Sequence, residues 1–293
     1  MIFKGLGVAV ITPFTPNNEV DTVALEKILE HIISGGANTL VMLGTTGESV
    51  TLTKEEKQTV INTAISVNKS RLNLVVGMGG YDTAAIIQNI ITTDLSKVDA
   101  ILSVTPYYNK PTQKGLYEHY SAIARATDKP IIMYNIPGRT SVNMTSDTTL
   151  KLANDFKNII AIKEASGNFE QVMKIVLNKP TGFSVISGDD VLTLPFMALG
   201  FDGLISVLGN AFPGLLSEML SATFVNDYDK ARKIHYKLFE VMSLMFVEGS
   251  PAGIKGLMNI MHFCTKKVRL PLWELSEETM NKIRENLIKE RLK

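Results

Sequence analysis

The sequence predicts an α/β protein, a (β/α)8 TIM barrel with a C-terminal helical extension. Short apolar runs rich in β-branched residues alternate with longer amphipathic stretches, so strand and helix signals follow one another along the chain. Eight such pairs fill about 225 residues, which is the usual size of a barrel of this kind. After Pro213 the strand signals stop, and only helical stretches follow.

The expected strands are almost continuously apolar. A strand with one solvated face alternates apolar and polar residues, whereas a parallel strand covered on both faces does not. The runs therefore indicate a parallel sheet surrounded by helices. A Rossmann-like open sheet is the alternative, and the number of units favours the barrel. The runs begin near residues 5, 39, 73, 100, 130, 158, 183 and 202.

Helix boundaries are marked in the segments between these runs. Asp21 precedes an amphipathic stretch that ends in two glycines, and the "TKEE" sequence from Thr53 is a capping box. Two of the last helical stretches read "DYDKARKIHYKLFEVMSLMF" and "SEETMNKIRENLIKERLK". We expect a catalytic barrel in residues 1–225 and a helical extension that packs on it in residues 226–293.

Composition excludes several classes of function. Thirty Lys and Arg against 29 Asp and Glu provide no overall field for nucleic acid or an acidic membrane. No uncharged apolar run reaches the roughly 18 to 20 residues of a membrane span. The N-terminal run is broken by Pro13 and lacks a small-x-small cleavage site, which favours a first strand over a signal peptide. The single Cys264 indicates a reducing compartment, so we expect a cytoplasmic protein with small-molecule substrates.

The sequence predicts no cofactor. The four histidines are scattered and no cysteine cluster accompanies them, so nothing indicates a metal site. The glycine-rich stretches "GLGVAV" and "GMGGYD" do not follow a strand as G-x-G-x-x-G at the start of a helix, and there is no P-loop sequence. Dinucleotide binding is therefore not expected.

Unusual chemistry follows the expected strands. The second strand ends in "GTTGES" at residues 44–49, the fourth in "TPYYNKP" at 105–111 and the fifth in "YNIPGRT" at 134–140, while the sixth carries Lys163. Function in such barrels concentrates at the carboxyl ends of the strands. Hydroxyl groups, a guanidinium and a lysine should therefore converge on one mouth of the barrel.

Strand alternation orients the lysine. Lys163 shares one face with Ala161 and Ala165, while the neighbouring isoleucines and Glu164 share the other, so the lysine should point into the barrel with room beside it. Desolvation lowers a lysine pKa from roughly 10.4 by up to about 3 to 5. A neutral amine can then form a Schiff base with a ketone. The alternative is a lysine that snorkels to solvent or pairs with Glu164.

Five motifs together resemble the dihydrodipicolinate synthase group of pyruvate-dependent class I aldolases. "GTTGES", "TPYYNKP", "YNIPGRT", "IKEASG" and "ISGDD" occur in the order and spacing of that family, and the resemblance runs from about residue 3 to the C-terminus. It implies that pyruvate, bound as a Schiff base, condenses with L-aspartate 4-semialdehyde to give 4-hydroxy-tetrahydrodipicolinate. That reaction belongs to diaminopimelate and lysine biosynthesis.

The resemblance also implies a role for each site residue. Lys163 would form the Schiff base, with Tyr134 above it in proton transfer. Thr45 and Tyr108 would complete a general acid–base relay, with Tyr108 supplied by a neighbouring subunit. The implied substrate-binding residues are Thr46 for the pyruvate carboxylate, Gly188 and Ile205 for main-chain contacts, and Arg139 for the semialdehyde carboxylate.

Two other functions remain open. A related branch, the sialic-acid lyases, lacks an arginine at the position of Arg139 and often has Ser-Thr in place of Thr45-Thr46. Both features favour the synthase over a pyruvate-dependent lyase of a sugar acid. The third possibility is a barrel that binds pyruvate-like ligands as a sensor or structural subunit, and the joint presence of the Schiff-base and relay residues counts against it.

The resemblance further implies a homo-oligomer, commonly a dimer of dimers, because a tyrosine supplied in trans requires at least two subunits. Members inhibited by lysine line an interface site with small, His, Asn, Glu and Tyr residues. The matching positions of this chain are Ser49, Val50, Lys54, Lys57, Tyr81, Ala85 and Tyr107. The lysines at 54 and 57 should repel an ammonium ligand, and the lack of an Asn at 81 and of an acid at 85 should leave it unpaired. We expect weak or absent inhibition by lysine.

Overall fold

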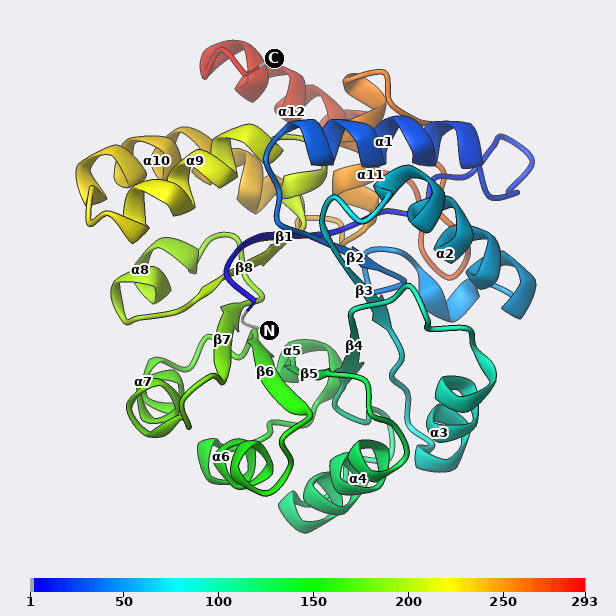
Figure 1. The fold of residues 1–293 in the computed structure, drawn as a ribbon. Helices are drawn as coiled ribbons and strands as arrows, with labels where there is room; N and C mark the ends of the chain where they lie inside the picture. Colours follow the sequence, from blue (N-terminus) through cyan, green and yellow to red (C-terminus); the bar gives the residue numbers. More distant parts are fainter. Residues whose placement is uncertain (1–2, 293) are drawn as a thin grey trace. The chain divides into compact units, whose positions relative to one another are not determined.

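The computed structural model describes residues 3–292 (Figure 1). Its strands form a closed parallel barrel in which each strand neighbours the next one along the chain. Each strand begins within one residue of the expected position, so the predicted (β/α)8 barrel is confirmed. The strands are β1 (Gly5–Ala9), β2 (Thr39–Met42), β3 (Asn73–Gly77), β4 (Ala100–Val104), β5 (Ile131–Asn135), β6 (Ile159–Glu164), β7 (Ser184–Ser187) and β8 (Gly203–Ser206).

Helices connect the strands and continue after β8, as expected from Pro213 onward. Those between strands are α1 (Thr22–Ser34), α2 (Lys54–Asn68), α3 (Thr83–Thr92), α4 (Gln113–Arg125), α5 (Pro137–Thr140), α6 (Ser146–Asp155), α7 (Phe169–Asn178) and α8 (Thr193–Ala198). The later ones are α9 (Pro213–Phe224), α10 (Tyr228–Leu244), α11 (Ala252–Ile260) and α12 (Glu277–Lys289). Short 3-10 turns, Ser49–Thr51 and Leu208–Asn210, complete the regular structure.

The expected helix caps are present. The Asp21 side chain accepts a hydrogen bond from the Ala24 N–H at the start of α1, which ends before Gly35. At the start of α2, the Thr53 hydroxyl accepts from the Glu56 N–H, and the Glu56 carboxylate accepts from the Thr53 N–H. Because side chains satisfy N–H groups that have no partner within the helix, the sequence sets where both helices begin.

The strands are buried on both faces, as their apolar composition predicts. Every residue of β2, β5, β7 and β8 is buried. This is the burial of a parallel sheet whose outer face is covered by helices and whose inner face forms the barrel core.

Two compact units make up the described chain. One is built around Val75–Ile205 and contains β4 to β7, with neighbouring helices in contact along their outer side in the order α3, α4, α6 and α7 (Figure 1). The other combines Gly5–Leu74 with the chain from Ser206 onward, and within it α9 packs beside α10 and α10 contacts α12. These units are the parts of the chain whose residues contact one another most. The expected boundary between barrel and extension at residue 225 stays a prediction. Within residues 3–292, none of the helices is both long and apolar enough to span a membrane.

Candidate active site

Lys163 lies in β6 with its side chain only 5% exposed. A Cβ placed on Gly188 would lie 2.9 Å from the Lys163 Cε and 2.9 Å from the Ala165 Cβ, so these two side chains face the same side of the strand. Glu164 faces the opposite side, where its carboxylate accepts a hydrogen bond from Gln171. The expected alternation is therefore confirmed, and the buried lysine does not reach solvent.

Tyr134 stands beside the lysine. In the parallel pairing of β5 with β6, Tyr134 is opposite Lys163, and the Lys163 Nζ lies 4.3 Å from the centre of the Tyr134 ring. The Thr105 N–H donates to the Tyr134 carbonyl at 2.9 Å, which fixes the end of β5 against the loop after β4. A buried phenol and a buried amine are thus held together at the carboxyl ends of two adjacent strands.

The surroundings of Lys163 favour its neutral form. Burial lowers the pKa of Lys163 to about 8, the nearby Asp190 carboxylate opposes this change, and the Arg139 guanidinium adds to it. At pH 7, a lysine with a pKa of about 8 is neutral in about one molecule in ten, against about one in three thousand for an unperturbed lysine. The site therefore raises the supply of nucleophilic amine by about two to three orders of magnitude.

Asp190 is a candidate that sequence reasoning missed. It is the second aspartate of the "ISGDD" motif, it is buried, and its charge stabilises the ammonium form of Lys163. The neighbouring Asp189 instead stabilises the turn before α8, because its carboxylate accepts a hydrogen bond from the Leu192 N–H. The motif alone gives no means of telling which of the two carboxylates faces the lysine.

Arg139 lies in the short helix α5 and its side chain is exposed. The Thr140 hydroxyl beside it can donate to the Val142 carbonyl at 2.9 Å or to the Ile136 carbonyl at 3.1 Å, which holds the turn together. Arg139 is therefore a solvent-accessible cation on an ordered support, close enough to Lys163 for its charge to act on the lysine pKa.

Tyr108 lies in the loop after β4 and is 90% exposed, with a positive φ of 71°. A non-glycine residue in this left-handed region is uncommon and indicates a backbone held by its surroundings. The next residue supplies two such contacts, since the Asn109 N–H donates to the Tyr107 carbonyl and the Asn109 amide donates to the Tyr81 carbonyl. The phenol of Tyr108 is thus presented outward.

The two remaining candidates of this unit are backbone positions. Gly188 follows β7, and its N–H donates to the Glu164 carbonyl at 2.8 Å. A side chain at this position would collide with the stem of Lys163, so the site requires glycine for space. Ile205 is buried in β8.

Thr45 and Thr46 belong to the other unit, in the loop that follows β2. Turn hydrogen bonds from the Gly47 N–H to the Gly44 carbonyl and from the Glu48 N–H to the Thr45 carbonyl shape this loop. The Thr45 side chain is exposed, and that of Thr46 is buried.

A buried ion pair supports this loop, and sequence reasoning missed it. The Lys255 ammonium contacts the Glu48 carboxylate, and the two side chains are 0% and 1% exposed. The same carboxylate accepts from the Arg269 N–H at 2.9 Å, and the ammonium donates to the Lys267 carbonyl at 2.9 Å and lies 3.9 Å from the Phe14 ring centre. The partners lie more than 200 positions apart in sequence, so no local pattern could indicate the pair.

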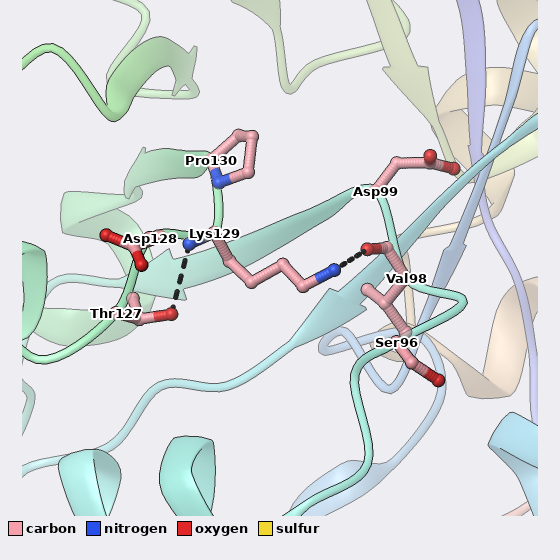
Figure 2. A pocket seen from close by; sticks show the side chains of 7 residues that line it. All are labelled: Ser96, Val98, Asp99, Thr127, Asp128, Lys129 and Pro130. Atoms are coloured by element: carbon pink, nitrogen blue, oxygen red, sulfur yellow. Dashed lines mark hydrogen bonds between the residues drawn. The ribbon is translucent and has the colours of Figure 1, made fainter.

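A cavity of about 530 Å³ lies away from these residues (Figure 2). The residues that line it directly precede β4 and β5. They are Ser96, Val98 and Asp99 before β4, and Thr127, Asp128, Lys129 and Pro130 before β5. The Lys129 ammonium donates to the Val98 carbonyl at 2.9 Å. Because barrel enzymes place their chemistry at the opposite, carboxyl ends of the strands, we assign this cavity no part in the site.

Known proteins resemble this chain over nearly its whole length. It is 50% identical to the 4-hydroxy-tetrahydrodipicolinate synthase of Parabacteroides distasonis, over 97% of this chain and 96% of that protein. The crystal structure of dihydrodipicolinate synthase from Aquifex aeolicus matches with a TM-score of 0.95 and 43% identity, over 99% of both chains. The Cyanidioschyzon merolae enzyme with lysine bound matches with a TM-score of 0.96 and 34% identity, over 99% of both chains. The model of the dihydrodipicolinate synthetase family matches residues 2–290, and the chain belongs to that family.

Proposed function

We propose that this chain is a 4-hydroxy-tetrahydrodipicolinate synthase, a lyase that condenses pyruvate with L-aspartate 4-semialdehyde in diaminopimelate and lysine biosynthesis. The names of its relatives support this activity. The observation that carries the chemistry is the buried Lys163 amine, whose pKa of about 8 makes it a nucleophile near neutral pH, 4.3 Å from the ring of Tyr134.

The reaction follows from that amine. The neutral Lys163 nitrogen adds to the ketone carbon of pyruvate, and loss of water leaves an imine. The protonated imine acts as an electron sink, so the methyl group loses a proton to give an enamine. The enamine carbon attacks the semialdehyde's aldehyde carbon, and the semialdehyde's amino group then displaces Lys163 by transimination. The product is cyclic 4-hydroxy-tetrahydrodipicolinate, the free lysine is regenerated, and no cofactor is needed.

The other residues are assigned by motif and position. Tyr134 is proposed to carry protons at the imine, with Thr45 and Tyr108 completing the relay, because a phenol and hydroxyls can pass protons without a titrating histidine. Thr46 is proposed to hold the pyruvate carboxylate. The exposed guanidinium of Arg139 suits bidentate binding of the semialdehyde carboxylate. Gly188 and Ile205 are proposed to supply main-chain contacts around the imine.

Borohydride trapping tests the proposal. The protein is treated with pyruvate and borohydride, with and without aspartate semialdehyde, and the reduced adduct is located by peptide mass. We expect an adduct at Lys163 that the semialdehyde depletes. An adduct that the semialdehyde leaves unchanged would indicate a pyruvate-dependent lyase of a sugar acid, and an imine without turnover of either substrate would indicate a ligand-binding barrel. The absence of an adduct would overturn the Schiff-base mechanism.

We further propose that the active form is a homo-oligomer, as a dimer of dimers. The 90% exposure of Tyr108 leaves this phenol free for a neighbouring subunit. A second surface lies on α7, where Phe169, Met173 and Leu177 recur at intervals of four and form one exposed apolar face, with Leu177 82% exposed. Such a face on a helix is typical of a surface that another chain covers.

Sedimentation velocity tests this assembly. We expect a tetramer for the unmodified protein and a smaller species for Leu177→Glu, because a charge would be buried in the α7 contact. An active monomer would contradict the role proposed for Tyr108. A cytoplasmic location, expected from the single cysteine, stays a prediction.

A further inference from the structure

The outer face of β5 and β6 carries a polar cluster directly behind the Schiff-base pair. The strands pair Tyr134 with Lys163 and, one position further, Asn135 with Glu164. Successive strand residues point to opposite faces, so the first pair faces the barrel interior and the second faces the helices. Asn135 and Glu164 are both 0% exposed, which is rare for a carboxylate.

The Glu164 carboxylate is surrounded by N–H donors. It accepts from the Asn135 amide at 3.1 and 3.3 Å, from the Ser166 N–H at 2.7 Å and from the Gln171 amide at 3.1 Å. Burial raises the pKa of Glu164, and these hydrogen bonds oppose that change. Every hydrogen-bond partner of this side chain is a donor. Only a side chain that accepts on both of its terminal atoms, as a carboxylate does, can therefore pair with all of them.

The cluster extends to the segment that follows α5. The Asn135 amide oxygen accepts from the Met144 N–H at 2.9 Å, and its nitrogen donates to the Asn143 side chain at 2.8 Å. Gln171, in α7, accepts from Asn143 at 2.8 Å and donates to the Met144 carbonyl at 3.1 Å. One carboxylate is therefore linked to β5, the chain after α5 and helix α7, in addition to its own strand.

We propose that Glu164 is a positioning residue for the reaction, which holds the strand ends that carry Lys163 and Tyr134 and the segment after Arg139 in the geometry that imine chemistry needs. This inference rests on the proposed function. The charges that act on Lys163 are those of Asp190 and Arg139. Glu164 therefore acts through backbone placement, and its loss should leave the titration of Lys163 in place.

The test variant is Glu164→Gln. It keeps the size of the side chain but turns an amide toward groups that are themselves donors, so the cluster must rearrange. A displacement of about 1 Å at a reacting group can cost about 100-fold in rate. We expect kcat/KM for both substrates, and the rate of borohydride trapping at Lys163, to fall roughly 10- to 100-fold. The midpoint of the pH dependence of trapping should not move.

The matched control is Asp202→Asn. Asp202 is a half-buried carboxylate of the same unit that accepts from the Lys179 ammonium at 2.7 Å and from the Val185 N–H at 2.9 Å. It directly precedes β8, at the amino end of the strands. We expect this variant to lose thermal stability without a change in kcat, KM or trapping rate at 25 °C.

Each outcome decides the inference. A Glu164→Gln protein that is less stable but has unchanged kcat, KM and trapping rate would make the cluster structural only. A shifted pH midpoint would replace positioning with an electrostatic role. If Glu164→Gln does not fold, the fallback variant is Gln171→Met, which removes one donor to the carboxylate. We expect the trapping rate to fall several-fold with an unchanged pH midpoint, and no fall would overturn the inference. Failure to trap pyruvate in the unmodified protein would instead overturn the proposed function.

Discussion

Replacing Lys163 by methionine should stabilise the protein while abolishing its chemistry. An unperturbed lysine titrates at 10.5, and burial lowers the pKa of Lys163 to about 8. The folded state therefore disfavours the ammonium form. A difference of about 2.5 between the two pKa values corresponds to about 3 kcal/mol, at about 1.4 kcal/mol for each pKa unit. Methionine has a similar length and no charge, so it should recover much of this free energy at neutral pH.

The sign of the pH dependence follows from linkage. Between pH 8 and 10.5 the unfolded chain keeps the proton on Lys163 and the folded protein does not, so the free energy of unfolding rises with pH in this window. The destabilisation by Lys163 is complete below pH 8 and is lost above 10.5. The advantage of Lys163→Met should therefore be about 3 kcal/mol at pH 7 and should shrink as the pH rises toward 10.5.

Urea denaturation of both proteins at equal protein concentration measures this difference. The exposed Lys233 offers a control, because Lys233→Met should change the free energy of unfolding by less than about 0.5 kcal/mol. Lys163→Met should form no borohydride adduct with pyruvate. Equal or lower stability of Lys163→Met at pH 7, or a gain that does not decline between pH 8 and 10.5, would refute the reasoning.

Three further predictions concern other parts of the molecule. Arg139→Ala should raise the KM for the semialdehyde roughly 10- to 100-fold, because the proposed charge-assisted contact of about 1.5 to 3 kcal/mol is lost. Pyruvate trapping should fall much less, since the guanidinium acts there only through its contribution to the lowered Lys163 pKa. Steady-state kinetics with each substrate varied measure both effects, and an equal rise in KM for the two substrates would contradict this role. Lys255→Met should lower the free energy of unfolding by about 3 to 5 kcal/mol, because Glu48 is left buried without its cation. A double variant that also carries Glu48→Gln should recover part of that loss, as measured by urea denaturation. L-lysine at sub-millimolar concentration should not lower the initial rate, since Lys54 and Lys57 are expected to repel its ammonium group, and inhibition in that range would contradict this expectation.

The strands and helices were predictable because their signals are local. Continuous apolar runs mark strands that are covered on both faces, and a hydroxyl or carboxylate before an amphipathic stretch marks a helix start. The capping box at Thr53 is an example, since both of its hydrogen bonds join residues three apart. The number of strand–helix units predicted a closed barrel, and in the structure each strand pairs with the next one along the chain.

Part of the site was predictable for the same reason. Alternation alone placed Lys163 on the side of the strand away from the helices, because successive residues of a strand point to opposite faces. The magnitude of burial that lowers its pKa was not predictable, since it depends on side chains from strands that are distant in sequence. Asp190 shows the same limit, because two adjacent aspartates read alike until the structure shows which one is buried.

The two buried lysines differ in the groups that contact their amines. Lys255 has the Glu48 carboxylate, a carbonyl oxygen and an aromatic ring around its ammonium group, all of which stabilise the positive charge. Lys163 has the ring of Tyr134 and the attraction of the Asp190 carboxylate, opposed by the guanidinium of Arg139. Burial lowers the pKa of both lysines, so the two differ in their contacts: the Lys255 ammonium is held by an anionic partner, whereas the Lys163 amine lies against the Tyr134 ring. The adjacent carboxylate does not pair with Lys163, because Glu164 points to the opposite face of the strand. There its oxygens accept four hydrogen-bond contacts from N–H groups.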